Sequence, residues 1–405
     1  MTIPPAGDRV LFVDDNQRVL DGLRRSVRTQ GVAWTAAFSE SGRDALDRLA
    51  LAPFDVVVAD MRMPMMDGAE LLAAVAQHHP RAIRLVLSGQ MDKRAAERAA
   101  AVAHGFLSKP VPGNTLCGTI DRLLGMRSRL PNDALRDVVN AVGALPSPPA
   151  SCAAILSVTA DPDVPTAAVV GAIERDIAFS AKLLQLSNSS FFGTRRSLTT
   201  VEGAIGHLGL AAVRAIALSE GVVASVAVNG TAIGDSIDAI EHHSLLVARV
   251  ARRIVPRSNM ADDAFTAGLL HDIGKLLLMT QLPERYQRVL DEARGRNCPL
   301  HVVEAETGAT HADVGGYLLG LWGLPDTVVD AVARHHAPLA DASEIDLITV
   351  VHAADALVHE NAALTAGWPP ATFDVRHFAA TGAEQRLPDW RQAMQRVLAD
   401  SAAVV

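Results

Sequence analysis

Cysteine is scarce in this chain. Three cysteines occur in 405 residues, at positions 117, 152 and 298, and no two of them form a CxxC pair. Cysteines so few and so far apart exclude a disulfide framework and suit the reducing conditions of the cytoplasm. Residues 1–9 are polar and carry proline, and they lack the apolar core of a secretory signal. We therefore expect a cytoplasmic protein.

An excess of positive charge is also absent. The formal net charge is −8, which argues against non-specific binding of DNA or of anionic membranes as the main activity. The apolar stretch 209–234 is interrupted by Arg214 and Glu220 and is rich in small residues. It predicts a buried helix pair rather than a membrane span, so we expect no membrane partner.

The length and composition predict several folded domains. A chain of 405 residues is long enough for two or three, and its 49% hydrophobic and 20% charged residues allow sizeable cores. The first 125 residues alternate between apolar runs and helical spacing. This pattern is typical of a doubly wound α/β domain with a parallel sheet.

Four short apolar runs in this region read as buried parallel strands, and helical stretches lie between them. The predicted strands are residues 10–13, 55–60, 84–88 and 105–108. The predicted helices are residues 19–28, 68–78 and 93–103.

The composition changes after residue 125. Residues 126–149 carry a short basic stretch and the segment Leu145-Pro-Ser-Pro-Pro149, which reads as a linker with one helix over 133–142. From residue 150 alanine, leucine and valine recur at helical spacing, and no strand pattern is present. We expect an all-helical domain over residues 150–360 and a tail of uncertain order over 361–405.

Acidic side chains follow the predicted strands. Asp14 and Asp15 come directly after the first strand, and Asp60 ends the second. In an open parallel sheet, ligands bind at the carboxyl ends of the strands. Three carboxylates there repel one another unless they share a cation, and Mg²⁺ prefers such oxygen ligands. Ser88 can then donate a hydrogen bond to a phosphate, and Lys109, one of only four lysines, can pair with it as a point charge.

These residues resemble the motif set of two-component receiver domains. The matching motifs are Asp14-Asp15, Asp60, Met63-Pro-Met-Met-Asp-Gly68, Ser88-Gly89 and Lys109-Pro110, over roughly residues 7–125. The resemblance implies a five-stranded parallel sheet and phosphorylation of Asp60 by a sensor histidine kinase.

The same resemblance implies the roles of the surrounding residues. It places Mg²⁺ on Asp15, Asp60 and the backbone carbonyl of Arg62, with help from Asp14. It places the switch aromatic at Phe106 and an often cis peptide at Lys109-Pro110.

A second set of chemically reactive residues lies in the helical region. Its members are His243, His271, Asp272, His311, His335, His336 and Asp355. Antiparallel helices could bring them together in a bundle core, where divalent transition metals are often held. A histidine, then His-Asp, then a late aspartate is the order seen in the HD phosphohydrolase superfamily. The resemblance to that superfamily implies that Lys275 would bind the substrate phosphate next to a metal-bound hydroxide.

Structural explanations stay open for the same residues. His242 and His243 could be solvated helix residues, and His335-His336 could be charged groups near a helix C-terminus. On residue types and order alone, a metal-capable pocket and a structural set are about equally supported.

The surrounding motifs resemble the HDOD domain, a signalling relative of the HD superfamily. They are Leu145-Pro-Ser-Pro-Pro149, Glu174-Arg-Asp176, Ala181–Asn188, Phe191-Phe-Gly193, Ala204–Leu210, Gly268–Lys275, His311-Ala-Asp-Val-Gly315, Trp322-Gly-Leu-Pro325 and His335-His336. This resemblance covers roughly residues 140–340 and implies an output module without demonstrated catalysis. The Gly-Tyr-Pro triplet that follows the paired histidines in HD-GYP cyclic-di-GMP phosphodiesterases is missing, because Ala337-Pro338-Leu339 stands there.

Two functions follow from these patterns. The first is a response regulator whose phosphorylated receiver changes the contacts of the HDOD module with an unknown downstream protein or with a second copy. The alternative is an enzyme, a receiver-gated metal-dependent phosphohydrolase or cyclic-dinucleotide phosphodiesterase. Direct DNA binding is not expected, because no helix-turn-helix with a basic recognition helix follows the receiver. Whether Arg127 and Arg129 lie in a dimerising linker helix stays open.

Overall fold

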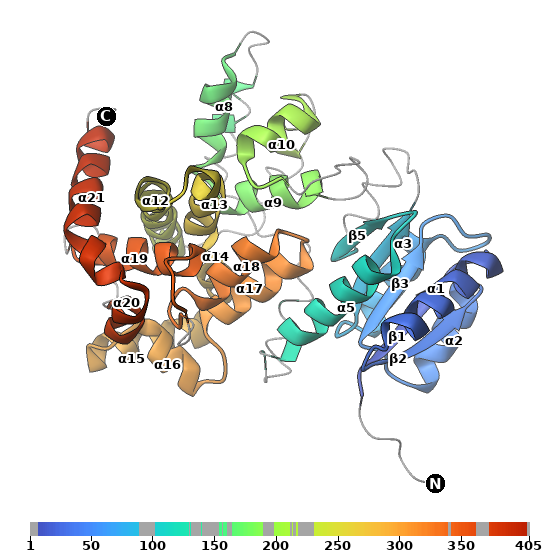
Figure 1. Cartoon of the computed structure of the whole chain (residues 1–405). Helices are drawn as coiled ribbons and strands as arrows, with labels where there is room; N and C mark the ends of the chain where they lie inside the picture. Colours follow the sequence, from blue (N-terminus) through green and yellow to red (C-terminus); the bar gives the residue numbers. More distant parts are fainter. Residues whose placement is uncertain are drawn as a thin grey trace. The chain divides into compact units, whose positions relative to one another are not determined.

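The computed structural model divides the chain into two compact units, an N-terminal α/β unit and a helical unit (Figure 1). It describes residues 7–88, 102–128, 164–188, 198–210, 231–338, 342–361 and 372–402, with short pieces at 130, 139, 154–155, 157–159, 213 and 216–217. Apart from residue 139, the predicted helix over 133–142 lies outside the described residues, as does most of the linker 126–149.

The α/β unit contains one parallel sheet of five strands in the order β2-β1-β3-β4-β5. The strands are β1 (Arg9–Val13), β2 (Thr35–Ser39), β3 (Val56–Asp60), β4 (Ile83–Ser88) and β5 (Gly105–Ser108). The four strands predicted from apolar runs are confirmed. β2 lies at the edge of the sheet and is only partly buried, and its short sequence TAAFS was not predicted as a strand.

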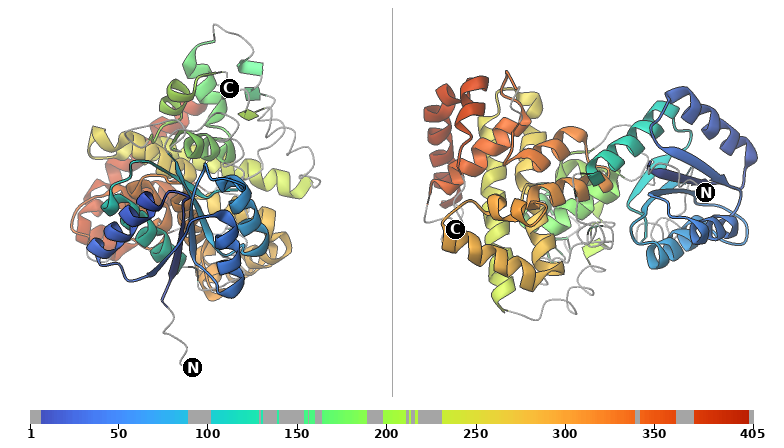
Figure 2. Two further views of the ribbon diagram at one scale, coloured as in Figure 1. Left: turned by 90° about the vertical axis from the view of Figure 1, so that its right-hand side faces the viewer. Right: turned by 90° about the horizontal axis from the view of Figure 1, so that it is seen from below.

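Helices flank this sheet. They are α1 (Gln17–Gln30), α2 (Gly42–Leu51), α3 (Gly68–His78) and α5 (Gly113–Ser128). α1 packs against α5, whereas α2 packs against α3, and the two pairs cover opposite faces of the sheet (Figure 2). The predicted helices over 19–28 and 68–78 are confirmed, and most of the one over 93–103 lies outside the described residues.

Local hydrogen bonds cap the first turns of α1 and α3, the helices that follow β1 and β3. The Asn16 side chain accepts a hydrogen bond from the Arg18 N–H at the start of α1. Asp67 and Glu70 form a reciprocal capping box at the start of α3. At the end of α5, Arg127 forms an ion pair with Asp55 at 2.5 Å, so this arginine belongs to the α/β unit.

The regular structure of the second unit is all helical among its described residues, as predicted. Its longer helices are α8 (Thr166–Ile173), α9 (Ile177–Asn188), α10 (Val201–Leu208), α12 (Thr231–Ile254), α13 (Ala261–Leu270), α14 (Ile273–Gln281), α15 (Pro283–Arg296), α16 (Leu300–Glu306), α17 (His311–Leu321), α18 (Asp326–Arg334), α19 (Leu347–His359), α20 (Val375–Thr381) and α21 (Leu387–Ala402), with 3₁₀ turns at Ser258–Met260 and Ala383–Arg386. Helices α20 and α21 lie within the segment 361–405.

Helix α12 is central to this unit. It packs against α13, α19 and α21, and α18 packs against both α13 and α19 (Figures 1 and 2). These contacts bring residues from positions 243 to 359 into one core. Among the helices that the structure describes, none combines the length and the apolar character needed to cross a membrane.

A buried acid on α12 makes the stability of this unit depend on pH. Burial, and then the charges of Asp176 and Asp238, raise the pKa of Glu241 from 4.5 to about 9. The folded chain therefore keeps a proton that the unfolded chain releases. Stability is highest below the unfolded pKa and falls as pH rises towards about 9, by up to about 1.4 kcal/mol per pH unit.

We expect Glu241→Gln to remove this dependence, because the amide cannot ionise. In urea unfolding, the variant should be more stable than the wild type near pH 8 and differ little from it near pH 5. Glu202→Gln, at an exposed position on α10, is the control and should shift both midpoints equally. An equal gain at both pH values for Glu241→Gln would contradict the prediction.

Candidate functional sites

The predicted acidic site lies at the edge of the sheet where the strand order reverses. Asp14 follows β1, Asp60 ends the neighbouring β3, and Lys109 follows β5. Asp14 and Asp60 are buried, with 2% and 9% of their surface exposed. The Lys109 Nζ donates hydrogen bonds to Asp14 Oδ2 and to Asp60 Oδ1. Three residues that lie far apart in the sequence therefore meet at one point.

Backbone groups orient the two carboxylates. The Asn16 N–H donates to Asp14 Oδ1 at 2.9 Å, and the Arg62 N–H donates to Asp60 Oδ2 at 2.8 Å. Gly68 makes this geometry possible, since a Cβ at that position would lie 2.3 Å from the carbonyl oxygen of Asp60. The requirement for glycine is steric, because a side chain at this position would prevent α3 from starting so close to the end of β3.

The charge balance of this site favours a cation. Asp14 and Asp60 share a single lysine, and Asp15 adds a third carboxylate that is exposed. Burial alone would lower the pKa of Lys109, but its hydrogen bonds to Asp14 and Asp60 outweigh burial and raise it. Carboxylate and backbone oxygens at the end of parallel strands are the donors that Mg²⁺ prefers, so these residues fit that ion.

The remaining predicted receiver residues are located by their backbone. Ser88 ends β4 and pairs with Ser108 of β5, and Phe106 pairs with Val86. The side chains of Ser88 and Phe106 lie outside the described residues. The Lys109-Pro110 peptide is cis, as the family resemblance implied.

The helical unit brings all seven predicted His and Asp residues into one cluster, which we call the helical pocket; six of them are buried and His336 is half-buried. His243 comes from α12, His271 and Asp272 from the junction between α13 and α14, and His311 from the start of α17. His335 and His336 follow α18, and Asp355 lies in α19. Three groups among them bring their nitrogen and oxygen ligand atoms within 4.8 Å: His311, His335 and His336; His243, His271 and Asp355; and His271, Asp272 and His335.

Close backbone contacts on both sides hold the His271-Asp272 pair. A Cβ on Gly268 would lie 2.8 Å from the Cα of Ala248 in α12. A Cβ on Gly274 would lie 2.0 Å from the carbonyl oxygen of His311. The glycines of the Gly268–Lys275 segment therefore let α13 approach α12 and let α14 approach α17. This packing sets the position of the two ligands between them.

Hydrogen bonds orient the buried imidazoles. The Nδ1 atoms of His271 and His335 lie 2.7 Å from the carbonyl oxygens of Gly268 and Val332. A carbonyl only accepts, so each Nδ1 carries a proton and a neutral ring keeps its lone pair on Nε2. Both Nε2 atoms are buried without a hydrogen-bond partner, as is Asp272 Oδ1. The inward-facing Nε2 lone pair of neutral His335 is the arrangement of a metal-ligating histidine, whereas His271 would have to release its Nε2 proton to bind a metal.

Two carboxylates lie against these imidazoles. Asp272 Oδ2 is 3.3 Å from His271 Nε2, while Asp272 Oδ1 is 3.3 Å from His311 Nε2. Asp355 Oδ1 is 3.0 Å from His243 Nε2 and 3.7 Å from His271 Nε2. Lys275, itself buried, donates to Asp272 Oδ2 at 2.7 Å. Asp272 therefore links the two sides of the pocket.

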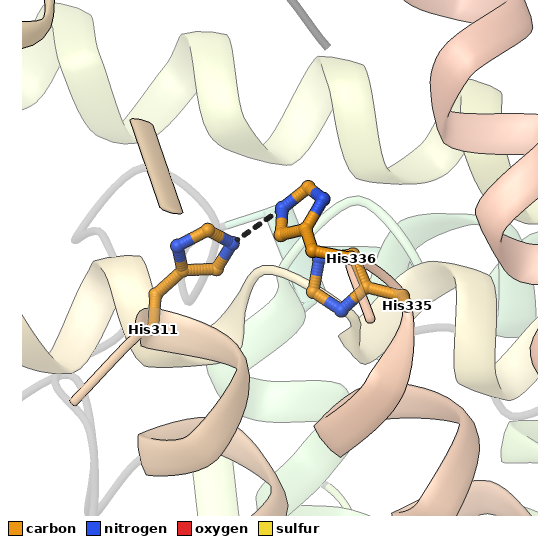
Figure 3. A group of neighbouring side chains, drawn as sticks. All are labelled: His311, His335 and His336. Carbon is orange, nitrogen blue, oxygen red and sulfur yellow. Dashed lines mark hydrogen bonds between the residues drawn. The ribbon is translucent and has the colours of Figure 1, made fainter. Parts of the chain in front are cut away.

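We call the group of His243, His271 and Asp355 the first position and the group of His311, His335 and His336 the second position. Figure 3 shows the second position, in which the Nε2 atoms of His311 and His336 face each other at 3.0 Å. Two imidazole nitrogens this close either share a proton or face a common cation. The donors of both positions, imidazole nitrogen and carboxylate oxygen, fit a divalent transition metal.

The protonation of the pocket reflects its buried negative charge. Burial would lower the pKa of His271, but the Asp272 and Asp355 carboxylates outweigh burial and raise it to about 10. Burial lowers the pKa of His243 to about 4 and keeps the pKa values of His335 and His336 well below their usual range. His335 is therefore neutral and buried, His336 is neutral and half-buried, and His243 is not a solvated helix residue, whereas His242 is exposed, as a solvated helix residue would be.

Four further residues join this pocket and were not predicted. Glu304 accepts from His311 Nδ1 at 2.6 Å, and Tyr286 donates to Glu304 at 3.0 Å. The His359 Nδ1 lies 3.0 Å from Asp355 Oδ1, and His301 stacks on His336 with ring centroids 4.4 Å apart. His359 could have been found, because it lies one helical turn after Asp355. The other three depend on the packing of α15 and α16.

An α/β unit with an acidic pocket and a helical unit with a buried histidine pocket define the class of the protein. The family model of the response regulator receiver domain matches residues 10–121, and that of the HDOD domain matches residues 145–338. The chain therefore carries a receiver domain followed by an HDOD domain, the composition of a two-component response regulator. Asp355 and helices α19 to α21 lie beyond the HDOD match.

Individual relatives are more distant. An uncharacterized protein of Treponema pallidum is 24% identical over 203 residues, which are 49% of this chain and 39% of that protein. The DNA-binding transcriptional regulator NtrC of Klebsiella pneumoniae is 33% identical over 114 residues, 28% of this chain and 24% of that protein. The chain thus spans less than half the length of these two relatives.

Among solved structures, the MmoQ response regulator of Methylococcus capsulatus is 28% identical. The alignment covers 63% of this chain and 98% of that chain, with a TM-score of 0.45. The assignment of the two domains rests on the family models.

Proposed function

We propose that this chain is a phosphorelay response regulator in which Asp60 accepts a phosphoryl group from a sensor histidine kinase. The observation that carries the proposal is the convergence of Asp14, Asp60 and Lys109 at the strand-order reversal. The Asp60 Oδ1 forms the new bond to phosphorus while the bond between phosphorus and the kinase histidine nitrogen breaks. Oδ2 stays on the Arg62 N–H.

Each surrounding residue has a role in this transfer. Asp14, Asp15, Asp60 and the Arg62 carbonyl would hold Mg²⁺, which neutralises charge on the transferring oxygens when bound. Lys109 leaves the Asp60 carboxylate and pairs with the new phosphate, and Ser88 donates a hydrogen bond to it. Phe106 follows this rearrangement as the switch aromatic. The free energy available to the helical unit is the difference in these contacts between the two states.

The output is a change in the contacts of the HDOD domain with a downstream protein or with a second copy of the chain, transmitted through residues 126–149. Hydrogen–deuterium exchange of the full chain, with and without acetyl phosphate and Mg²⁺, tests this coupling. We expect altered protection both in the receiver domain and in helices of the HDOD domain. A change confined to residues 7–128 would rule out the coupling.

A second candidate function is favoured by a separate observation, the buried ligand atoms of His271, His335 and Asp272 that have no hydrogen-bond partner. We propose that the pocket holds two divalent transition metals and acts as a phosphohydrolase gated by the receiver. A bound metal would supply a hydroxide at neutral pH and polarise the phosphate. Asp272 would hold both ions, and Lys275 would keep the Asp272 carboxylate in place.

Elemental analysis together with hydrolysis of bis(p-nitrophenyl) phosphate and of a cyclic dinucleotide tests this second candidate. We expect two tightly held ions per chain in the wild type and none in His271→Ala/Asp272→Ala. Metal without hydrolysis would reduce the pocket to a binding or structural role, which is in keeping with the missing Gly-Tyr-Pro triplet after His336. A wild-type chain without metal would rule out both versions.

A further inference from the structure

A third carboxylate lies behind the second position. Glu304, on α16, has 2% of its surface exposed. Its Oε2 accepts from the backbone N–H of His311 at 3.0 Å and from His311 Nδ1 at 2.6 Å. Its Oε1 accepts from the Tyr286 hydroxyl at 3.0 Å. Three donors from two neighbouring segments therefore hold this one buried carboxylate.

The contact determines which nitrogen of His311 is available. An ionised carboxylate only accepts, so Nδ1 carries a proton and Nε2 is left to face the pocket. That Nε2 lies 3.0 Å from His336 Nε2 and 3.3 Å from Asp272 Oδ1. His271 and His335 have neutral backbone carbonyls in the same place. His311 thus differs from them in having an anionic partner, which makes the imidazole a stronger donor to a metal.

Packing alone does not account for a buried acid here. Helices α15 and α16 are already joined by an exposed ion pair in which Arg296 contacts Glu306 at 2.7 and 2.8 Å. Burying a carboxylate costs free energy that this connection does not require. The placement of Glu304 is explained by what it does to the imidazole of His311.

We propose that Tyr286 and Glu304 are positioning residues that orient and strengthen His311 as a ligand, and so set the metal affinity of the second position. The proposal rests on the metal-binding function proposed above. It adds that the two positions are unequal, because an anionic partner supports a ligand of the second position. The α15–α16 pair would then control the occupancy of that position without contacting the ion.

Titration of the metal-free full-length chain with Co²⁺, followed by visible absorption, tests the proposal. Glu304→Gln keeps the shape of the side chain but removes its charge. We expect the affinity for Co²⁺ at the second position to fall by about 10–100-fold, while the affinity at the first position stays as in the wild type. The absorption bands of the second ion should also shift. Tyr286→Phe should also lower the affinity at the second position, but by a smaller factor. Glu284→Gln, at an exposed position on the same helix as Tyr286, should leave both ions unchanged.

The outcomes separate this proposal from the one on which it rests. A wild-type chain that takes up no Co²⁺ overturns both. Two ions bound with unchanged affinities and spectra in Glu304→Gln overturn only the positioning role. Equal loss of both ions, together with a lower melting temperature, would assign Glu304 to the structure of the domain and also overturn it.

Discussion

Replacing Asp60 with asparagine is expected to abolish phosphorylation of this chain completely. Asparagine fits the same space and can still accept the hydrogen bond from the Arg62 N–H, but its amide is not a nucleophile towards phosphorus. The measurement is incubation with acetyl phosphate and Mg²⁺, followed by intact-mass analysis. The wild type should gain one phosphoryl group that hydroxylamine removes, and Asp60→Asn should gain none.

Asp47→Asn provides a matched control, since Asp47 lies on α2 and is exposed. It should be phosphorylated like the wild type. Lys109→Gln tests the role of Lys109. This variant keeps Asp60 but loses the cation that balances the buried carboxylates of Asp14 and Asp60. Phosphoryl gain in Asp60→Asn equal to that of the wild type would show that another residue is the acceptor.

Replacing Asp272 with asparagine is expected to remove both metal ions from the helical pocket. Its two oxygens face histidines of different positions, each at 3.3 Å, so it is the carboxylate that the positions share. Asp355→Asn should weaken binding of the ion at the first position most, because Asp355 Oδ1 lies 3.0 Å from His243 Nε2 and 3.7 Å from His271 Nε2, whereas Asp355 Oδ2 lies 3.8 Å from His336 Nδ1 of the second position. Elemental analysis after gel filtration measures both stoichiometries.

Stability must be separated from metal binding in this test. Asp272→Asn takes away the carboxylate to which buried Lys275 donates, and losing one partner of a buried pair costs about 3–5 kcal/mol. Asp272→Asn/Lys275→Met removes both charges and should recover much of that stability without recovering metal. If the double variant regains two ions, Asp272 is not a ligand.

Much of the α/β unit could be predicted from sequence. Strands β1 and β3 are buried on both faces, so their sequences are continuous apolar runs. The start of α3 is marked by Asp67, which forms a capping box with Glu70. Strand β2 could not be found in the same way. It is an edge strand whose only large apolar side chain is Phe38, and its place depends on pairing with β1.

The helical pocket, too, could be predicted from the sequence only in part. Residue type and order alone identified His243, His271, Asp272, His311, His335, His336 and Asp355, because each belongs to a motif or to an expected helix. The same patterns could not separate a buried pocket from solvated histidines. Burial and distance decide that, and both depend on α12, α13, α18 and α19 packing together.

The sequence by itself determined the two domains. It also gave Asp60 as the expected phosphoacceptor and the seven His and Asp residues as candidate ligands, since these depend on local spacing and residue chemistry. Only the tertiary structure brought in Glu304, Tyr286 and His301 and oriented the imidazoles. Those features arise where separate helices meet, at Gly268 and Gly274 and between α16 and α17. No pattern within one segment records which helix lies across from it.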